Sequence, residues 1–94
     1  MSMIEYQDQY LEFIRMRGVG KNDLVADSCK SYKSYLHSVS KLIGENISPD
    51  ILKSEADIIN IERELNGRRA SRTIANYRSA MRQYIAFVES ESLA

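Results

Sequence analysis

The sequence predicts an all-α protein, a compact bundle of four or five helices. In several stretches apolar residues recur at alternating spacings of three and four, which places them on one face of a helix with 3.6 residues per turn. Short segments that contain Gly or Pro separate these stretches, and no useful length of alternating apolar and polar residues predicts a strand. Helices joined by short connections bury their apolar faces by packing as a bundle.

The chain is short enough to form one domain, residues 1–94. A hydrophobic content of 44% and a charged content of 28% are typical of a globular protein and not of a disordered tail. The net charge of zero argues against a protein that coats nucleic acid or membranes by bulk charge. The start lacks the basic and apolar pattern of a signal peptide, and no apolar run approaches the roughly 20 residues that span a bilayer. With Cys29 as the only cysteine, no intrachain disulfide can form. We therefore expect a cytoplasmic protein that does not bind membranes.

The first predicted helix covers about residues 3–17. Its aromatic residues, Tyr6, Tyr10 and Phe13, fall on one side. Gly18 and Gly20 follow, and glycine can take the positive φ that closes a helix end.

The second predicted helix covers about residues 27–43, with Asp27 or Ser28 as its cap and Gly44 as its stop. Its core positions repeat regularly: Cys29, Tyr32, Leu36, Val39 and Ile43. Nearly opposite lies a basic stripe without an acid: Lys30, Lys33, His37 and Lys41.

The third predicted element covers about residues 48–66 and is acidic. Ser48 and Pro49 form a helix-start signal. Ser54 and Asp57 stand three apart, a weak form of the capping box, so the element is either one bent helix or two helices that break near residue 54. It carries five acids against two bases.

The last predicted helix covers about residues 71–90, with Ser71 as a cap. Its core stripe is Ile74, Tyr77, Met81, Tyr84 and Val88. Arg78 and Arg82 flank that stripe. From residue 67 to residue 83 there are five arginines and no acid. One side of this helix is thus apolar and the other side is basic.

The two basic stripes are the candidate functional surface. Arg offers a fork for phosphate or guanine, Lys offers a point charge, and short polar side chains add hydrogen bonds to phosphates or base edges. The alternative is that these are ordinary solvated faces that balance the acidic third element. The side chains that could meet a phosphate backbone or base edges are Lys30, Lys33, Lys41, Arg68, Arg69, Arg72, Arg78, Arg82, Thr73 and Asn76, and of these we expect all but Arg78 and Arg82 to contact DNA.

Signatures of an enzyme are missing from the sequence, which has one histidine, one cysteine, no Gly-rich phosphate loop and no metal-ligand spacing. We expect His37 to be a solvated surface imidazole and Cys29 a small buried hydrophobic residue. Tyr32, Tyr77 and Tyr84 fall on core stripes. The chain is therefore predicted to have no catalytic activity, no cofactor and no small-molecule substrate.

The run S-R-T-I-A-N-Y-R-S-A-M-R-Q-Y-I-A-F-V, from Ser71 to Val88, resembles the final helix of the core-binding domain of tyrosine recombinases and phage integrases. Further similarities follow in the same order along residues 6–90. They are Tyr10-Leu11-Glu12-Phe13 through Gly18, Ser31-Tyr32 with Tyr35-Leu36, and Asp57-Ile58 followed by Leu65 and Gly67.

The resemblance implies a SAM-like helical bundle that forms one half of a clamp around duplex DNA, with the second and last helices facing the duplex. These are the helices that carry the basic stripes. In that family the catalytic residues belong to a separate C-terminal domain, which implies that this chain is a fragment of a longer protein. The resemblance also implies other recombinase protomers as partners in an assembly.

Two other functions stay open at this point. The acidic third element and the tyrosine-rich first helix would suit a helical protein-interaction module. By resemblance, similar bundles also precede nuclease domains in some restriction-type proteins, so a DNA-binding domain attached to a nuclease is a further alternative.

Overall fold

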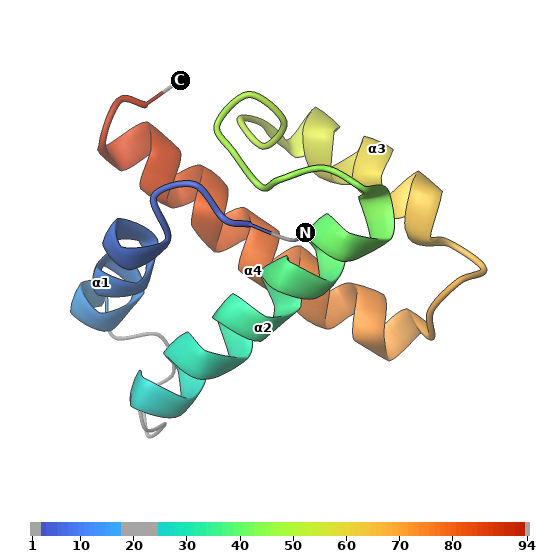
Figure 1. Ribbon diagram of the computed structural model, residues 1–94, viewed down its shortest axis with the longest axis horizontal. Coiled ribbons are helices and arrows are strands. Elements are labelled where there is room, and N and C mark those ends of the chain that lie inside the picture. The colour runs from blue at the N-terminus through green and yellow to red at the C-terminus, as the bar shows by residue number, and fades with distance from the viewer. Residues whose placement is uncertain (1–2, 18–24, 94) are drawn as a thin grey trace.

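The computed structural model describes residues 3–17 and 25–93, with side chains for residues 3–16 and 30–93. Within these residues the chain forms four helices and no strand: α1 (Gln7–Arg17), α2 (Val25–Ile43), α3 (Glu55–Leu65) and α4 (Ser71–Ser90) (Figure 1). The prediction of a compact all-α bundle is confirmed. None of these helices is long and apolar enough to cross a membrane.

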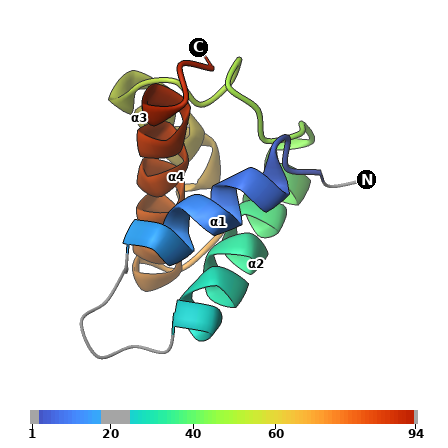
Figure 2. The same ribbon diagram turned by 90° about the vertical axis from the view of Figure 1, so that its left-hand side faces the viewer.

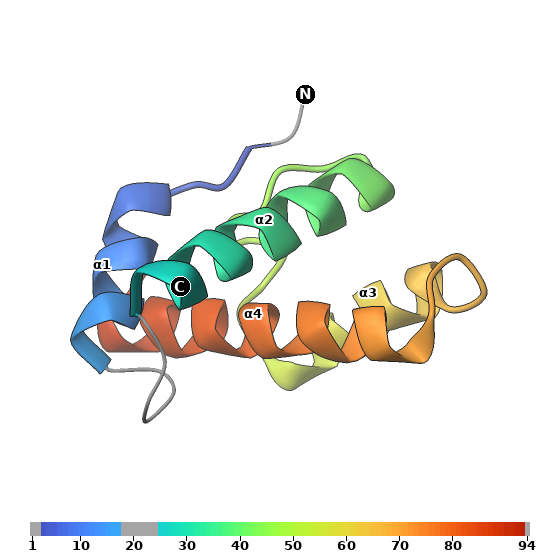
Figure 3. The same cartoon turned by 90° about the horizontal axis from the view of Figure 1, so that it is seen from below.

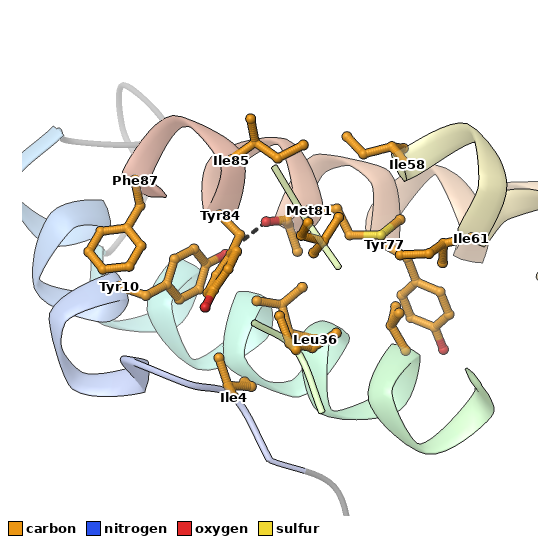
Figure 4. Packing of buried hydrophobic residues seen from close by; sticks show 14 of the residues in the cluster. Ile4, Tyr10, Leu36, Ile58, Ile61, Tyr77, Met81, Tyr84, Ile85 and Phe87 are labelled. Atoms are coloured by element: carbon orange, nitrogen blue, oxygen red, sulfur yellow. Dashed lines mark hydrogen bonds between the residues drawn. The ribbon is translucent and has the colours of Figure 1, made fainter. Parts of the chain in front are cut away.

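Helix α4 is the centre of the bundle and contacts the other three helices. Its predicted core stripe is buried from Ile74 to Val88, and Tyr84 and Met81 are fully inaccessible to solvent (Figure 4). Each large apolar side chain that is buried in this way stabilises the fold by roughly 1.5–3 kcal/mol. Helix α1 lies across α2 and α4 at one end of the bundle, with α3 on the far side of α4 (Figure 2). The two ends of α4 therefore have different neighbours.

The first helix begins at Gln7 and not at residue 3 as predicted. The backbone before it is extended and pairs with the connection between α2 and α3. The N–H of Glu5 donates to the carbonyl of Ile47 at 2.8 Å, and the N–H of Ile47 donates to the carbonyl of Met3 at 2.9 Å. Pairing buries Ile4 and Ile47 and satisfies the backbone at the same time. Tyr6, with φ of 58°, makes the corner into the helix. The predicted stops Gly18 and Gly20 lie outside the described residues.

The second helix begins two residues earlier than predicted, at Val25, so Asp27 and Ser28 fall inside it and do not cap it. It ends as predicted before Gly44, which has φ of +74°. In that left-handed conformation glycine lets the N–H of Glu45 reach back to the carbonyl of Ser40 at 3.2 Å.

Of the two arrangements expected for residues 48–66, the structure has the one that is broken near residue 54, but its first part is a turn and not a helix, so the helix start predicted at Ser48 and Pro49 is wrong. Residues 48–52 form a single turn, in which the N–H of Leu52 donates to the carbonyl of Ser48 at 3.0 Å, and α3 starts only at Glu55. The Ser54 side chain makes no cap bond. Instead the Asp57 carboxylate accepts the N–H of Lys53 at 2.9 Å, one residue before the position that a capping box would use.

Candidate nucleic-acid interface

Helix α2 packs across α4 at a steep angle (Figure 1), and α3 lies behind α4 in the view of Figure 3. Tyrosine rings mark the place where α2 and α4 cross. The ring of Tyr35 on α2 lies 6.0 Å from that of Tyr77 on α4, and 6.2 Å from that of Tyr32. Tyr77 is buried, as its position on the core stripe predicts. Tyr32 and Tyr35 are half-buried. The two helices that the sequence selected are therefore in direct contact.

The loop between α3 and α4 rests against the end of α2. Nη1 of Arg68 donates to the carbonyl of Leu42, in the last turn of α2, at 3.3 Å. Nη1 of Arg69 donates to the carbonyl of Arg68 at 2.7 Å. Helix ends leave carbonyls without a partner in the helix, so a nearby arginine is a favourable donor there. The preceding Gly67 has φ of +85°, which lets the chain turn at this point.

This contact brings the exposed Lys41, next to Leu42, to the same end of the molecule as the loop arginines. Arg72, in the first turn of α4, is also exposed. We call this group the basic end: Lys41, Arg68, Arg69 and Arg72.

Asn76 and Thr73 extend the basic end along α4. Asn76 is exposed one turn after Arg72, and Thr73 is half-buried beside it. Because successive residues turn by about 100° around a helix, Asn76 and Arg78 lie on opposite flanks of α4. Arg78 faces α3, where it pairs with Glu62, so Asn76 lies on the flank away from α3. The start of α4 thus presents a cation, a hydroxyl and an amide close together.

The first turn of α4 is electropositive through its backbone as well. Ala70 occupies the N-cap position, and its carbonyl accepts the N–H of Ile74 at 3.0 Å. The prediction of Ser71 as the cap was wrong, because Ser71 is already the first helical residue. No side chain caps this end, and its first turn contains no acid. Its uncapped N–H groups and the positive end of the helix dipole both favour an anion.

The acids of α3 are matched to two other arginines. Glu62 pairs with Arg78, and Glu55 pairs with Arg82 at 2.8 Å. The alternative that the basic residues balance the acidic third element is therefore correct for Arg78 and Arg82. In the part of the chain that the structure describes, no residue of the basic end makes an ion pair.

Lys30 and Lys33 are exposed but lie apart from the basic end. Lys30 precedes Lys41 by eleven residues, about 16 Å along a helix. Lys33 lies on the flank of α2 that faces α1, the flank that also carries His37. The lysines of the basic stripe are therefore exposed along α2 as a stripe, but of the three only Lys41 lies near the loop arginines.

His37 differs from its prediction as a solvated imidazole. It is half-buried, with Nε2 3.0 Å from Oε1 of Gln7 on α1. The reason is that α1 crosses α2 at this point, which the sequence of α2 does not reveal. The side chain of Cys29 lies outside the described residues. Among the described residues, no group of three or more His, Cys, Asp or Glu is placed to hold a metal ion.

Sequence reasoning missed the anchoring of Arg68 to α2. A run of arginines beside a glycine after an acidic helix marks a basic loop, but it does not say which helix end the loop will meet.

Comparison of the chain with family models, with curated proteins and with solved structures gives no match. The similarity to tyrosine recombinases accordingly stays a resemblance of sequence motifs.

Proposed function

We propose that this chain binds duplex DNA through the α2–α4 face, with the basic end as its main contact. The observation that carries the proposal is the division of the arginines of residues 67–83. Arg78 and Arg82 are held by acids of α3, whereas the arginines of the basic end are exposed and make no ion pair within the described residues. Four cations next to an uncapped helix start form a surface suited to a phosphate backbone.

The residues divide into two roles. The four cations of the basic end, the Thr73 hydroxyl and the first N–H groups of α4 would contact phosphates, which fix the position of the protein on DNA. Asn76, one turn further along, would reach a base edge, where its amide can pair with adenine. Lys30, about 16 Å from Lys41 along α2, would add a phosphate contact further along the duplex. Lys33, on the flank of α2 that faces α1, lies outside this surface.

The resemblance to core-binding domains gives this surface a context. In that context the chain is the module that positions DNA for a recombinase or integrase, and cleavage and joining are carried out by residues outside it. Such a clamp requires cations from both helices at one surface, and the hydrogen bond from Arg68 to Leu42 joins the end of α2 to the loop before α4. The absence of a metal-binding group among the described residues is compatible with this role but does not argue for it.

Fluorescence anisotropy with a labelled non-specific duplex tests the proposal. We expect a dissociation constant of roughly 10⁻⁴–10⁻⁶ M at physiological salt, with tighter binding at lower salt. With the four phosphate contacts of the basic end, a plot of the logarithm of the association constant against the logarithm of the salt concentration should have a slope of about −3 to −4, and a phosphate contact of Lys30 would make it steeper. Absence of binding at low salt, or binding that does not respond to salt, would contradict the proposal.

A further inference from the structure

The end of the molecule opposite the basic end carries a second surface. A groove of about 430 Å³ lies between α1 and the last turn of α4. Phe13 from α1 and Phe87 from α4 line its floor, and Met16 from α1 lies at its edge. The rings of Phe13 and Phe87 lie 5.7 Å apart, and Phe87 is 1% exposed, so the floor is part of the folded core.

The edge of the groove is also apolar, because it is formed by Met16, whose side chain is 79% exposed. Isolated apolar residues are common on protein surfaces, but this one borders a concavity with an aromatic floor. Methionine is flexible and polarisable, and it is frequent where a surface adapts to a partner's apolar side chains. The groove thus offers a site for one or two apolar anchors of a helix.

Two carboxylates belong to the lining of the groove, Glu12 from α1 and Glu91 from the end of α4, and no basic residue does. Arg15 pairs with Glu12, and Glu91 makes no ion pair with a described residue. The charged groups at the rim are therefore acidic.

From this charge we infer that the groove binds a basic amphipathic helix of a partner protein, with its apolar residues on Phe13, Met16 and Phe87 and its lysines or arginines facing Glu12 and Glu91. A helix binds a groove through apolar residues spaced three and four apart, and complementary charge at the rim selects the partner and speeds association. This inference is independent of DNA binding, since the two surfaces lie at opposite ends of α4.

The test is an amide-resolved NMR titration of the full chain with a synthetic helical peptide of about 18 residues, or five turns, that has leucines on one face and lysines on the other. A second peptide keeps the leucines and replaces each lysine by glutamate. We expect saturable shifts in residues 9–16 and 87–91 with the first peptide only. Saturation at α3 instead, equal binding of both peptides, or no saturation at millimolar peptide would overturn the inference.

Two exposed positions supply the matched variants. Met16→Glu should weaken binding of the basic peptide about tenfold, because it places a charge where an apolar anchor docks. Ile59→Glu makes the same kind of change at a 50% exposed residue of α3 and should leave binding unchanged. Circular dichroism confirms that both variants fold. Equal effects of the two variants would contradict the groove as the site.

A charge test and a concentration series complete the experiment. The double variant Glu12→Lys, Glu91→Lys should weaken binding about fivefold or more at low salt, and less at high salt.

Spectra of the chain alone over a range of concentrations test a second copy as the occupant. Shifts in residues 9–16 and 87–91 that grow with protein concentration would show self-association through the groove and overturn the inference of a basic partner.

Discussion

Tyr10 and Tyr84 hold the first and last helices together by a reciprocal pair of hydrogen bonds. The Tyr10 hydroxyl on α1 donates to the carbonyl of Ala80 on α4 at 3.0 Å, and the Tyr84 hydroxyl on α4 donates to the carbonyl of Glu5, just before α1, at 2.8 Å. Their rings lie 5.3 Å apart and are fully buried (Figure 4). This contact fixes α1 over one end of α4 and leaves the other end, with its arginines, open to solvent.

Removal of the Tyr84 hydroxyl should destabilise the fold. Tyr84→Phe keeps the ring and loses one buried hydrogen bond, so we expect the free energy of unfolding to fall by about 1 kcal/mol. Urea denaturation at pH 7 measures it. Tyr35→Phe is the matched control, because the Tyr35 ring is half-buried and its hydroxyl makes no hydrogen bond to a described residue. An equal loss in both variants would show that the Tyr84 bond contributes nothing specific.

The same tyrosine predicts a loss of stability in alkali. Burial, followed by the nearby Glu5 and Tyr6, raises the pKa of Tyr84 in the folded protein. Unfolded, its pKa returns to about 10. Folding therefore favours the neutral hydroxyl. Below pH 10 the hydroxyl is neutral in both states and its contribution to the free energy of unfolding is complete. Above pH 10 the unfolded chain ionises first, so the free energy of unfolding falls by up to about 1.4 kcal/mol per pH unit.

The Tyr84→Phe variant has no ionisable group at residue 84, so it should lack this alkaline loss of stability. We expect the unfolding free energies of the parent and of Tyr84→Phe to converge as the pH rises above 10, although the parent is the more stable at pH 7. Denaturation series at pH 7, 9 and above 10 would measure the difference. A difference that stays constant across the series would contradict the assignment.

The two ion pairs between α3 and α4 should contribute unequally to stability. The Glu62 side chain is 18% exposed where it meets Arg78, whereas Glu55 is 59% exposed where it meets Arg82. Water screens the exposed pair more strongly. Glu62→Gln should therefore lower the unfolding free energy by about 1 kcal/mol, and Glu55→Gln by much less. Thermal unfolding of both variants compares them, and equal effects would refute the ranking.

Reversal of the charge at Arg72 should weaken DNA binding without unfolding the domain. Arg72 is exposed and makes no ion pair within the described residues, so Arg72→Glu should keep the helical circular dichroism spectrum. It should raise the dissociation constant for a non-specific duplex about tenfold. Arg82→Glu makes the same change in charge on the same helix, on the flank of α3. If both variants lose affinity equally, net charge and not the basic end determines binding.

The contribution of Arg68 to DNA binding should change the salt dependence of the affinity. Arg68→Ala removes one phosphate contact of the basic end, so the slope of log K against log salt should become less steep by about 1. Arg63→Ala provides the control, because Arg63 is an exposed arginine at the end of α3. Anisotropy titrations at several salt concentrations give both slopes. An unchanged slope for Arg68→Ala would remove the loop from the interface.

Local sequence patterns predicted those parts of the fold that depend on neighbouring residues. The 3–4 spacing of the last helix identified its buried face from Ile74 to Val88, and the Ser54–Asp57 signal indicated the break before α3 as one of two arrangements. The pairing of Ile4 with Ile47 could not be predicted in this way. Its cause is a contact between segments more than 40 residues apart, and the helical spacing of Tyr6 and Tyr10 concealed it.

The candidate site shows the same division. The periodicity of α2 and α4 located the basic stripes, and the acidic third element suggested partners for some arginines. Only the packing of α3 against α4 determines that Arg78 and Arg82 are the paired ones. Likewise, only the turn at Gly67 and the position of α2 bring Arg68 to Leu42. The sequence therefore predicted the charges of the site but not which of them act together.

Binding of DNA by α2 and the start of α4 can be mapped by an amide-resolved NMR titration with a short non-specific duplex at low and moderate salt. We expect shifts at Lys41, in residues 66–76 and along the exposed side of α2, which weaken as the salt concentration rises. Absence of shifts at low salt, or shifts confined to α3 and the groove beside α1, would contradict it.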